Sequence, residues 1–144
     1  MNKWTDDYLA LCEFWAIQKS KDPSTKVGAV IVNKHNHIVG LGYNGFPKGV
    51  NDHQRRYEDK PTKYSMVVHA EANAILNATQ SLHGCTLYVA PLPPCNECAK
   101  LIIQSGIKHV ISYEPKSEVW AESFKTSKLM FDEAGVTVYL RKGC

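Results

Sequence analysis

Two short segments, His-Ala-Glu at residues 69–71 and Pro-Cys-Asn-Glu-Cys at residues 94–98, constrain the fold of this chain most strongly. Together they offer one imidazole and two thiolates, a ligand set that binds zinc and leaves the fourth position open for water. The candidate ligands are His69, Cys95 and Cys98. Glu71 is close enough to His69 to reach a zinc-bound water without binding the metal itself. The chain must therefore fold so that these two distant segments meet.

The spacing within each segment predicts how they meet. Cys95 and Cys98 are three residues apart and so face the same side of a helical turn, and Pro94 just before them suits a helix start. His69 and Glu71 are two residues apart, so they converge only where a helix begins. We therefore expect the metal to lie between two helix N-termini, whose dipoles favour anionic thiolates.

Two other interpretations of this motif stay open. A structural zinc site would need a fourth protein ligand, and the candidates by residue type are Cys12, His83, Cys85 and Cys144. None of them completes a second paired motif, and we expect Cys12 and Cys85 to pack in the core. The Cys-x-x-Cys spacing could also occur by chance without any metal.

Composition narrows the class of protein. A chain of 144 residues, 44% hydrophobic and 22% charged, is expected to form one globular domain over residues 1–144. Its net charge of +3 comes from dispersed residues, which argues against a nucleic-acid partner. Five cysteines with one Cys-x-x-Cys, and no apolar leader, favour a reducing, cytoplasmic location. No stretch is long enough to cross a bilayer, so we expect no membrane association.

Hydrophobic periodicity predicts four helices and five strands. The helices are expected at residues 5 to about 19–21, 69–78, 95–105 and 118–134, and the strands at 27–32, 38–42, 85–90, 108–113 and 136–140. A hairpin followed by strand–helix units predicts a mixed sheet with helices on both faces. The fold class is therefore α/β, a three-layer α/β/α sandwich around a five-stranded mixed sheet.

The segment from Gly42 to Tyr64 is predicted to be a long loop. It opens with three glycines and a proline in eight residues, which indicates a tight turn that brings the backbone close to something. The segment continues to Tyr64 without clear periodicity, and a structureless connection of roughly twenty residues in a compact domain is usually functional or disordered. Its basic residues could meet an anionic ligand or simply be solvated.

The chain resembles the deoxycytidylate deaminases of the cytidine deaminase-like superfamily over nearly its whole length. His-x-Glu followed by Pro-Cys-x-x-Cys is the signature of zinc nucleobase deaminases, and the Gly-Tyr-Asn-Gly loop narrows the resemblance to the deoxynucleotide branch. The segments that carry it are Asp22–Ala29, Gly42–Pro47, His69–Ile75 and Pro94–Lys100.

The resemblance implies hydrolytic deamination of dCMP to dUMP and ammonia, which supplies thymidylate synthesis. It assigns the metal to His69, Cys95 and Cys98, with one zinc per subunit because the long loop contains no cysteine. Zinc lowers the pKa of water in the fourth position. Glu71 takes the proton of that water, passes it to ring N3 and then helps the amine leave.

The resemblance also implies contacts along the substrate. The backbone at Ala70 and Pro94 reads the base edge, and Asn44 contacts the sugar. The candidates for the phosphate are Ser24, Lys26, Tyr113 with the turn after it, and Lys116. This chain has Glu-Pro-Lys-Ser after that strand where relatives carry a tyrosine.

Members of this family are typically hexamers that dCTP activates and dTTP inhibits, with Mg²⁺ on the triphosphate. The corresponding effector loop is Asn44–Asp52, and its candidate residues are Asn44, Gly45, Phe46, Lys48, Gly49 and Asp52. Three competing functions stay open. They are a tRNA adenosine deaminase, a free-nucleoside deaminase and a non-enzymatic zinc module that binds nucleotides or a partner protein.

Overall fold

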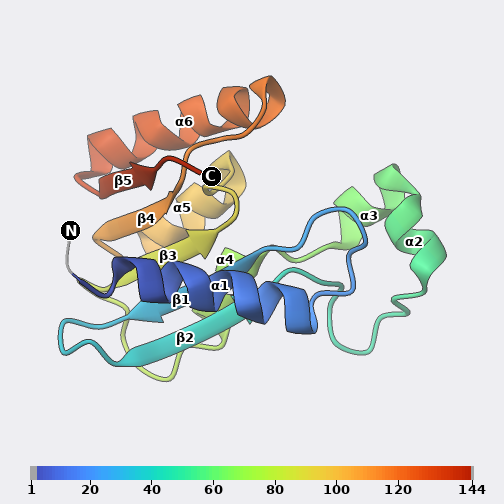
Figure 1. Ribbon diagram of the computed structural model, residues 1–144, viewed down its shortest axis with the longest axis horizontal. Helices are drawn as coiled ribbons and strands as arrows, with labels where there is room; N and C mark the ends of the chain where they lie inside the picture. The colour runs from blue at the N-terminus through green and yellow to red at the C-terminus, as the bar shows by residue number, and fades with distance from the viewer. Residues whose placement is uncertain (1–2, 144) are drawn as a thin grey trace.

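The computed structural model describes residues 3–143 and forms a sheet with helices on both faces (Figure 1). Its strands are β1 (Gly28–Val32), β2 (Ile38–Tyr43), β3 (Thr86–Ala90), β4 (His109–Tyr113) and β5 (Thr137–Arg141). Its helices are α1 (Thr5–Lys19), α2 (Gln54–Glu58), α3 (Lys60–Met66), α4 (Ala70–Leu76), α5 (Asn96–Gln104) and α6 (Glu118–Ala134). Every expected element is present, with bounds that differ by two residues or fewer.

The sheet is mixed, as the hairpin followed by strand–helix units predicts. Its strand order is β2-β1-β3-β4-β5. β1 pairs antiparallel with both β2 and β3, whereas β3, β4 and β5 are parallel. The carboxyl ends of β3 and β4 therefore lie at the same edge, and the Pro-Cys segment follows β3 there.

Alternating residues of β1 divide the core into two layers. Ala29 and Ile31 pack with residues of α4, α5 and α6 on one face of the sheet. Val30 and Val32 pack with Tyr8 and other α1 residues on the opposite face. The three-layer α/β/α prediction is confirmed. No helix within residues 3–143 combines the length and apolar character that crossing a bilayer requires.

The prediction of a structureless connection from residue 42 to 64 is wrong. Residues 54–66 form α2 and α3, which lie at the side of the molecule beyond the sheet (Figure 1). Phe46 stacks on the buried Tyr57 of α2 with ring centroids 4.5 Å apart. Two helices of one or two turns have too few residues to show a periodic apolar face, which is why the pattern did not reveal them.

Two glycines of β2 let α4 approach the sheet unusually closely. A Cβ atom on Gly42 would lie 2.4 Å from the backbone N of Ala74 and 2.5 Å from the carbonyl oxygen of Ala70. A Cβ on Gly40 would lie 2.6 Å from the carbonyl oxygen of Ala74. Both alanines are fully buried. This close packing fixes the start of α4, where the His-Ala-Glu segment lies.

Candidate metal and nucleotide site

The three predicted metal ligands converge between two helix N-termini. His69 is the N-cap of α4 and Cys95 is the N-cap of α5, both in extended backbone conformation. The Nδ1 atom of His69 lies 3.3 Å from the Sγ of Cys98 and 3.4 Å from the Sγ of Cys95. The ligand atoms of all three residues lie within 4.8 Å of one another.

This donor set fits a tetrahedral zinc ion. With zinc–nitrogen and zinc–sulfur bonds of about 2.1 and 2.3 Å, two such ligands lie about 3.6 Å apart. The His69–Cys98 and His69–Cys95 separations are close to that value. Within residues 3–143 no fourth His, Cys, Asp or Glu belongs to the cluster. The alternative ligand Cys144 lies outside the described residues.

The pKa values of Cys95, His69 and Glu71 are all shifted from their ordinary values. A hydrogen bond with the Cys98 thiol lowers the pKa of Cys95, and a hydrogen bond with Cys95 raises the pKa of His69. Glu71 is only 4% exposed, and its burial raises the pKa of the carboxyl group to about 7. A carboxyl group with that pKa can both accept and return a proton near neutral pH.

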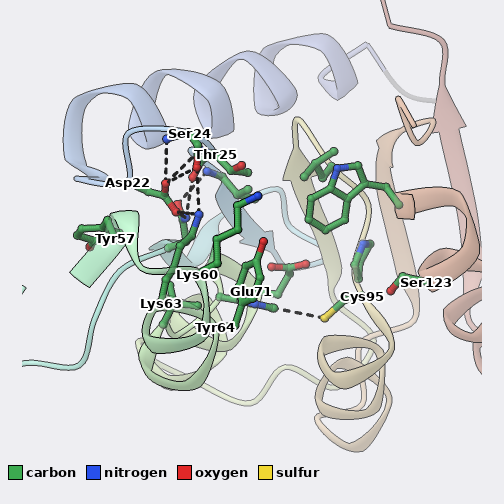
Figure 2. Close-up of a pocket in the computed structure, with 18 of the residues that line it drawn as sticks. Asp22, Ser24, Thr25, Tyr57, Lys60, Lys63, Tyr64, Glu71, Cys95 and Ser123 are labelled. Carbon is green, nitrogen blue, oxygen red and sulfur yellow. Dashed lines mark hydrogen bonds and ion pairs between the residues drawn. The ribbon is translucent and has the colours of Figure 1, made fainter. Parts of the chain in front are cut away.

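A cavity of about 500 Å³ opens beside Glu71 and the cluster. Its lining includes His69, Cys95 and Glu71 at one end and the turn of Ser24 and Thr25 at the other (Figure 2). Further lining residues from three helices are Tyr57, Glu58, Lys60, Lys63, Tyr64, Trp120 and Ser123. A volume of this size accommodates a small organic ligand.

The structure brings four of the seven predicted substrate residues to this cavity. Those that line it are Ser24, Asn44, Ala70 and Pro94. The other three, Lys26, Tyr113 and Lys116, are not among the residues that line it. Lys26 instead donates a 2.5 Å hydrogen bond from its Nζ to the carbonyl oxygen of Ser20.

The Asn44 side chain is already fully used by the protein. Its Oδ1 accepts hydrogen bonds from the backbone N of Val27 and the hydroxyl of Ser20, both at 2.9 Å. Its Nδ2 donates to the carbonyl oxygen of Thr25 at 2.9 Å and to Asp22 at 3.5 Å. Asn44 therefore ties the turn at residues 22–25 to the end of β2, and the predicted sugar contact stays a prediction.

The sequence did not distinguish Lys63 from the other basic residues of its segment, but Lys63 lies on α3 and is only 8% exposed. Its Nζ lies 2.8 Å from Oδ2 of the fully buried Asp22 and donates to the hydroxyl of Ser24 at 3.1 Å. The Ser24 hydroxyl itself donates to Asp22 Oδ1 at 3.1 Å. Nearby Lys60 is exposed and makes no ion pair with another residue of the described chain.

Sequence reasoning also missed the contribution of α6. Trp120 and Ser123 line the cavity from this helix, and Ser127 donates a 2.9 Å hydrogen bond to the carbonyl oxygen of Pro94. The apolar pattern of α6 carried no signal for these contacts.

The predicted effector loop connects with the cavity at two points. Gly45 and Val68 exchange backbone hydrogen bonds of 3.1 and 2.8 Å, immediately before His69. Phe46 stacks on Tyr57, which lines the cavity. Of the other predicted effector residues, Lys48 and Gly49 are exposed, and Asp52 pairs with Lys21 at 2.9 Å.

Comparisons with known proteins agree with this geometry. Residues 2–114 match the family model described as the cytidine and deoxycytidylate deaminase zinc-binding region. Deoxycytidylate deaminase of Pongo abelii is 50% identical over 94% of this chain and 78% of its own length. The human deoxycytidylate deaminase is 49% identical over the same shares. The crystal structure of the dCMP deaminase from cyanophage S-TIM5, in complex with dCMP and dUMP, is 25% identical with a TM-score of 0.79. It covers 98% of this chain and 99% of that chain.

Proposed function

Because the chain belongs to the cytidine and deoxycytidylate deaminase family, we propose that it hydrolyses dCMP to dUMP and ammonia in a zinc-dependent reaction. The observation that supports this function best is the buried Glu71 beside the His69, Cys95 and Cys98 cluster, at one end of the 500 Å³ cavity. A structural zinc site would have no use for a buried carboxyl group facing a cavity. The dUMP product would feed thymidylate synthesis.

The reaction replaces the C4–N4 bond of cytosine with a C4–O bond. Zinc bound by the cluster would lower the pKa of water in its fourth position to about 7. Glu71 accepts the first proton of the attacking water and delivers it to ring N3. It then takes the second proton, from the new hydroxyl on C4, and gives it to the amine, which leaves as ammonia while the C4 carbonyl forms. The backbone at Ala70 and Pro94, which line the cavity, would hold the base edge.

The phosphate end of the substrate would lie against Ser24, Thr25 and Lys60. These residues line the cavity, and the exposed ammonium of Lys60 supplies charge that the paired Lys63 does not. Phosphate oxygens form strong charge-assisted hydrogen bonds with lysine. Lys60 is thus a better candidate than Lys26 or Lys116 for this contact.

Ammonia release by the purified protein tests the proposal. We expect turnover of dCMP, and much weaker turnover of deoxycytidine, which lacks the phosphate. Glu71→Gln should lose turnover by a factor of about 10²–10⁴ while it retains one zinc per subunit. Glu97→Gln removes an exposed carboxyl group of α5 and serves as the matched control. Equal turnover of deoxycytidine and dCMP, or an active Glu71→Gln variant, would contradict the proposal.

We further propose regulation by dCTP and dTTP, each with Mg²⁺, at the loop of residues 44–52 in a homo-hexamer. The two links from this loop to Val68 and Tyr57 support the idea, because they join it to the residue before His69 and to the cavity wall. Initial rates with each triphosphate, and the mass of the assembly in solution, test it. Rates that respond to neither triphosphate would contradict the regulation. A cytoplasmic location agrees with the four free cysteines among residues 3–143.

A further inference from the structure

We propose that Lys63 is a positioning residue that fixes the turn of residues 22–25 at the end of the cavity opposite Glu71. This role rests on the proposed deamination of dCMP, since the turn would then hold the phosphate-bearing end of the nucleotide. Lys63 belongs to α3, 41 positions along the chain from Asp22, and nothing in the local sequence connects the two.

Burial and contacts separate Lys63 from an ordinary surface lysine. Its side chain is 9% exposed, and that of Asp22 is fully buried, with their charged atoms 2.8 Å apart. Burying a charge is costly unless it is paired and hydrogen-bonded. The other ion pairs among residues 3–143 have side chains that are at least one-third exposed. The Asp22–Lys63 pair is therefore built into the fold at this place.

Asp22 links Lys63 to the turn through its two carboxylate oxygens. One carboxylate oxygen, Oδ1, accepts hydrogen bonds from the backbone N–H groups of Ser24 and Thr25 at 3.0 and 3.2 Å and from the Ser24 hydroxyl. The other oxygen, Oδ2, meets the Lys63 ammonium. Figure 2 shows these contacts as one connected group beside the cavity. Because Lys63 also donates to the Ser24 hydroxyl, it holds the turn at two points.

This arrangement assigns different tasks to two lysines one helical turn apart. Lys63 is neutralised by Asp22 and cannot offer net charge to a phosphate, whereas Lys60 has no such partner among the described residues. Loss of Lys63 should therefore disturb the geometry of the turn rather than remove the charge that attracts the ligand. The base end of the cavity, formed by α4 and α5, should be affected much less.

The test compares Lys63→Met, Lys63→Arg and the double variant Asp22→Asn/Lys63→Met. For Lys63→Met we expect the KM for dCMP to rise by about tenfold to a hundredfold, with kcat within about threefold and zinc content unchanged. Amide hydrogen exchange at Ser24 and Thr25 should accelerate. Lys63→Arg should recover part of the KM. Lys125→Met, which breaks an exposed lysine–glutamate pair of α6, is the matched control and should leave the kinetics unchanged.

The double variant distinguishes two effects of Lys63→Met, the loss of a positioning contact and the burial of the Asp22 carboxylate without a counter-ion. It leaves no buried carboxylate without a counter-ion, so it should recover stability while the KM stays high. If both stability and KM recover, or if Lys63→Met has an unchanged KM, the positioning role is refuted while the deaminase function stands. If Lys63→Met does not fold, the Lys63→Arg and double variants decide the question. Wild-type protein that does not turn over dCMP would refute the proposed function and this role with it.

Discussion

Replacing Gly42 with alanine should damage both stability and catalysis, because β2 and α4 touch at this residue. The added Cβ would lie 2.4 Å from the backbone N of Ala74 and 2.5 Å from the carbonyl oxygen of Ala70. Non-bonded carbon contacts are comfortable at about 3.5–4.0 Å, so strand and helix must separate by about 1 Å. Neither neighbour can yield alone, since both are backbone atoms of fully buried residues within α4.

The cost of this overpacking is typically about 1–3 kcal/mol. For a chain of this size that corresponds to a fall in Tm of roughly 3–9 °C. The displaced helix carries His69 at its N-cap and Glu71 in its first turn. A shift of about 1 Å at reacting groups can cost up to a hundredfold in rate. We therefore expect kcat/KM for dCMP to fall by about tenfold or more.

Thermal unfolding, zinc content and steady-state kinetics of Gly42→Ala measure the two effects together. Gly143→Ala is the control, because its Cβ would meet only the Lys116 side chain at 3.9 Å. A Gly42→Ala variant that melts and turns over dCMP like the wild type would show that β2 and α4 are not held in close contact at this residue. A lower Tm with an unchanged kcat/KM would contradict the catalytic half of the prediction, because the start of α4 would then be held by contacts other than its packing on β2.

Three other predictions follow from the same structure. Removal of zinc by a chelator should abolish dCMP turnover and lower Tm, with both restored by Zn²⁺ but not by Mg²⁺; a fully active metal-free protein would contradict the assigned ligands. Burial raises the pKa of Asp22, but Lys63 and backbone N–H groups more than offset it, so the folded pKa lies below its ordinary value. The stability that Asp22 contributes is thus fully present above an unfolded pKa of about 3.9 and is lost as pH falls through the lower folded value. The difference in unfolding free energy between wild type and Asp22→Asn, measured in urea, should therefore shrink below pH 4, and a constant difference from pH 3 to 7 would count against it. Burial also raises the pKa of Cys12, so a thiol reagent should modify it only after unfolding, as mass spectrometry of labelled native protein can check.

The sequence was most informative where the backbone pattern itself encodes geometry. The i, i+2 spacing of His69 and Glu71 permits convergence only at a helix start, and the structure places His69 at the N-cap of α4. The i, i+3 spacing of Cys95 and Cys98 likewise predicted a helical turn, and the structure places Cys95 at the N-cap of α5. The mixed sheet with helices on both faces followed from the alternation of strands and helices, since a hairpin and parallel strand–helix units leave few topologies open.

Side-chain partnerships between distant segments were not predictable in this way. A lysine in a polar stretch has the same local signal whether it is solvated or buried, so Lys63 could not be told from Lys60. Lys26 was a phosphate candidate by family resemblance, yet its Nζ donates a hydrogen bond to the carbonyl oxygen of Ser20. Trp120 reaches the cavity because α6 packs on α5. This is a tertiary contact that the local sequence pattern does not encode.

The two ends of the cavity are built by different means, and this difference explains why they differ in predictability. The end with Glu71 is formed by α4 and α5, whose small buried residues pack directly on the sheet. The other end is formed by a turn and by α3, which lies beyond the sheet (Figure 1). The buried residue of α3 is Lys63. A buried ion pair supplies the missing constraint there. The metal ligands and Glu71 are held by the packing of α4 and α5 on the sheet. The end that would bind the phosphate is held by Lys63, so substitutions of Lys63 should change KM more than kcat.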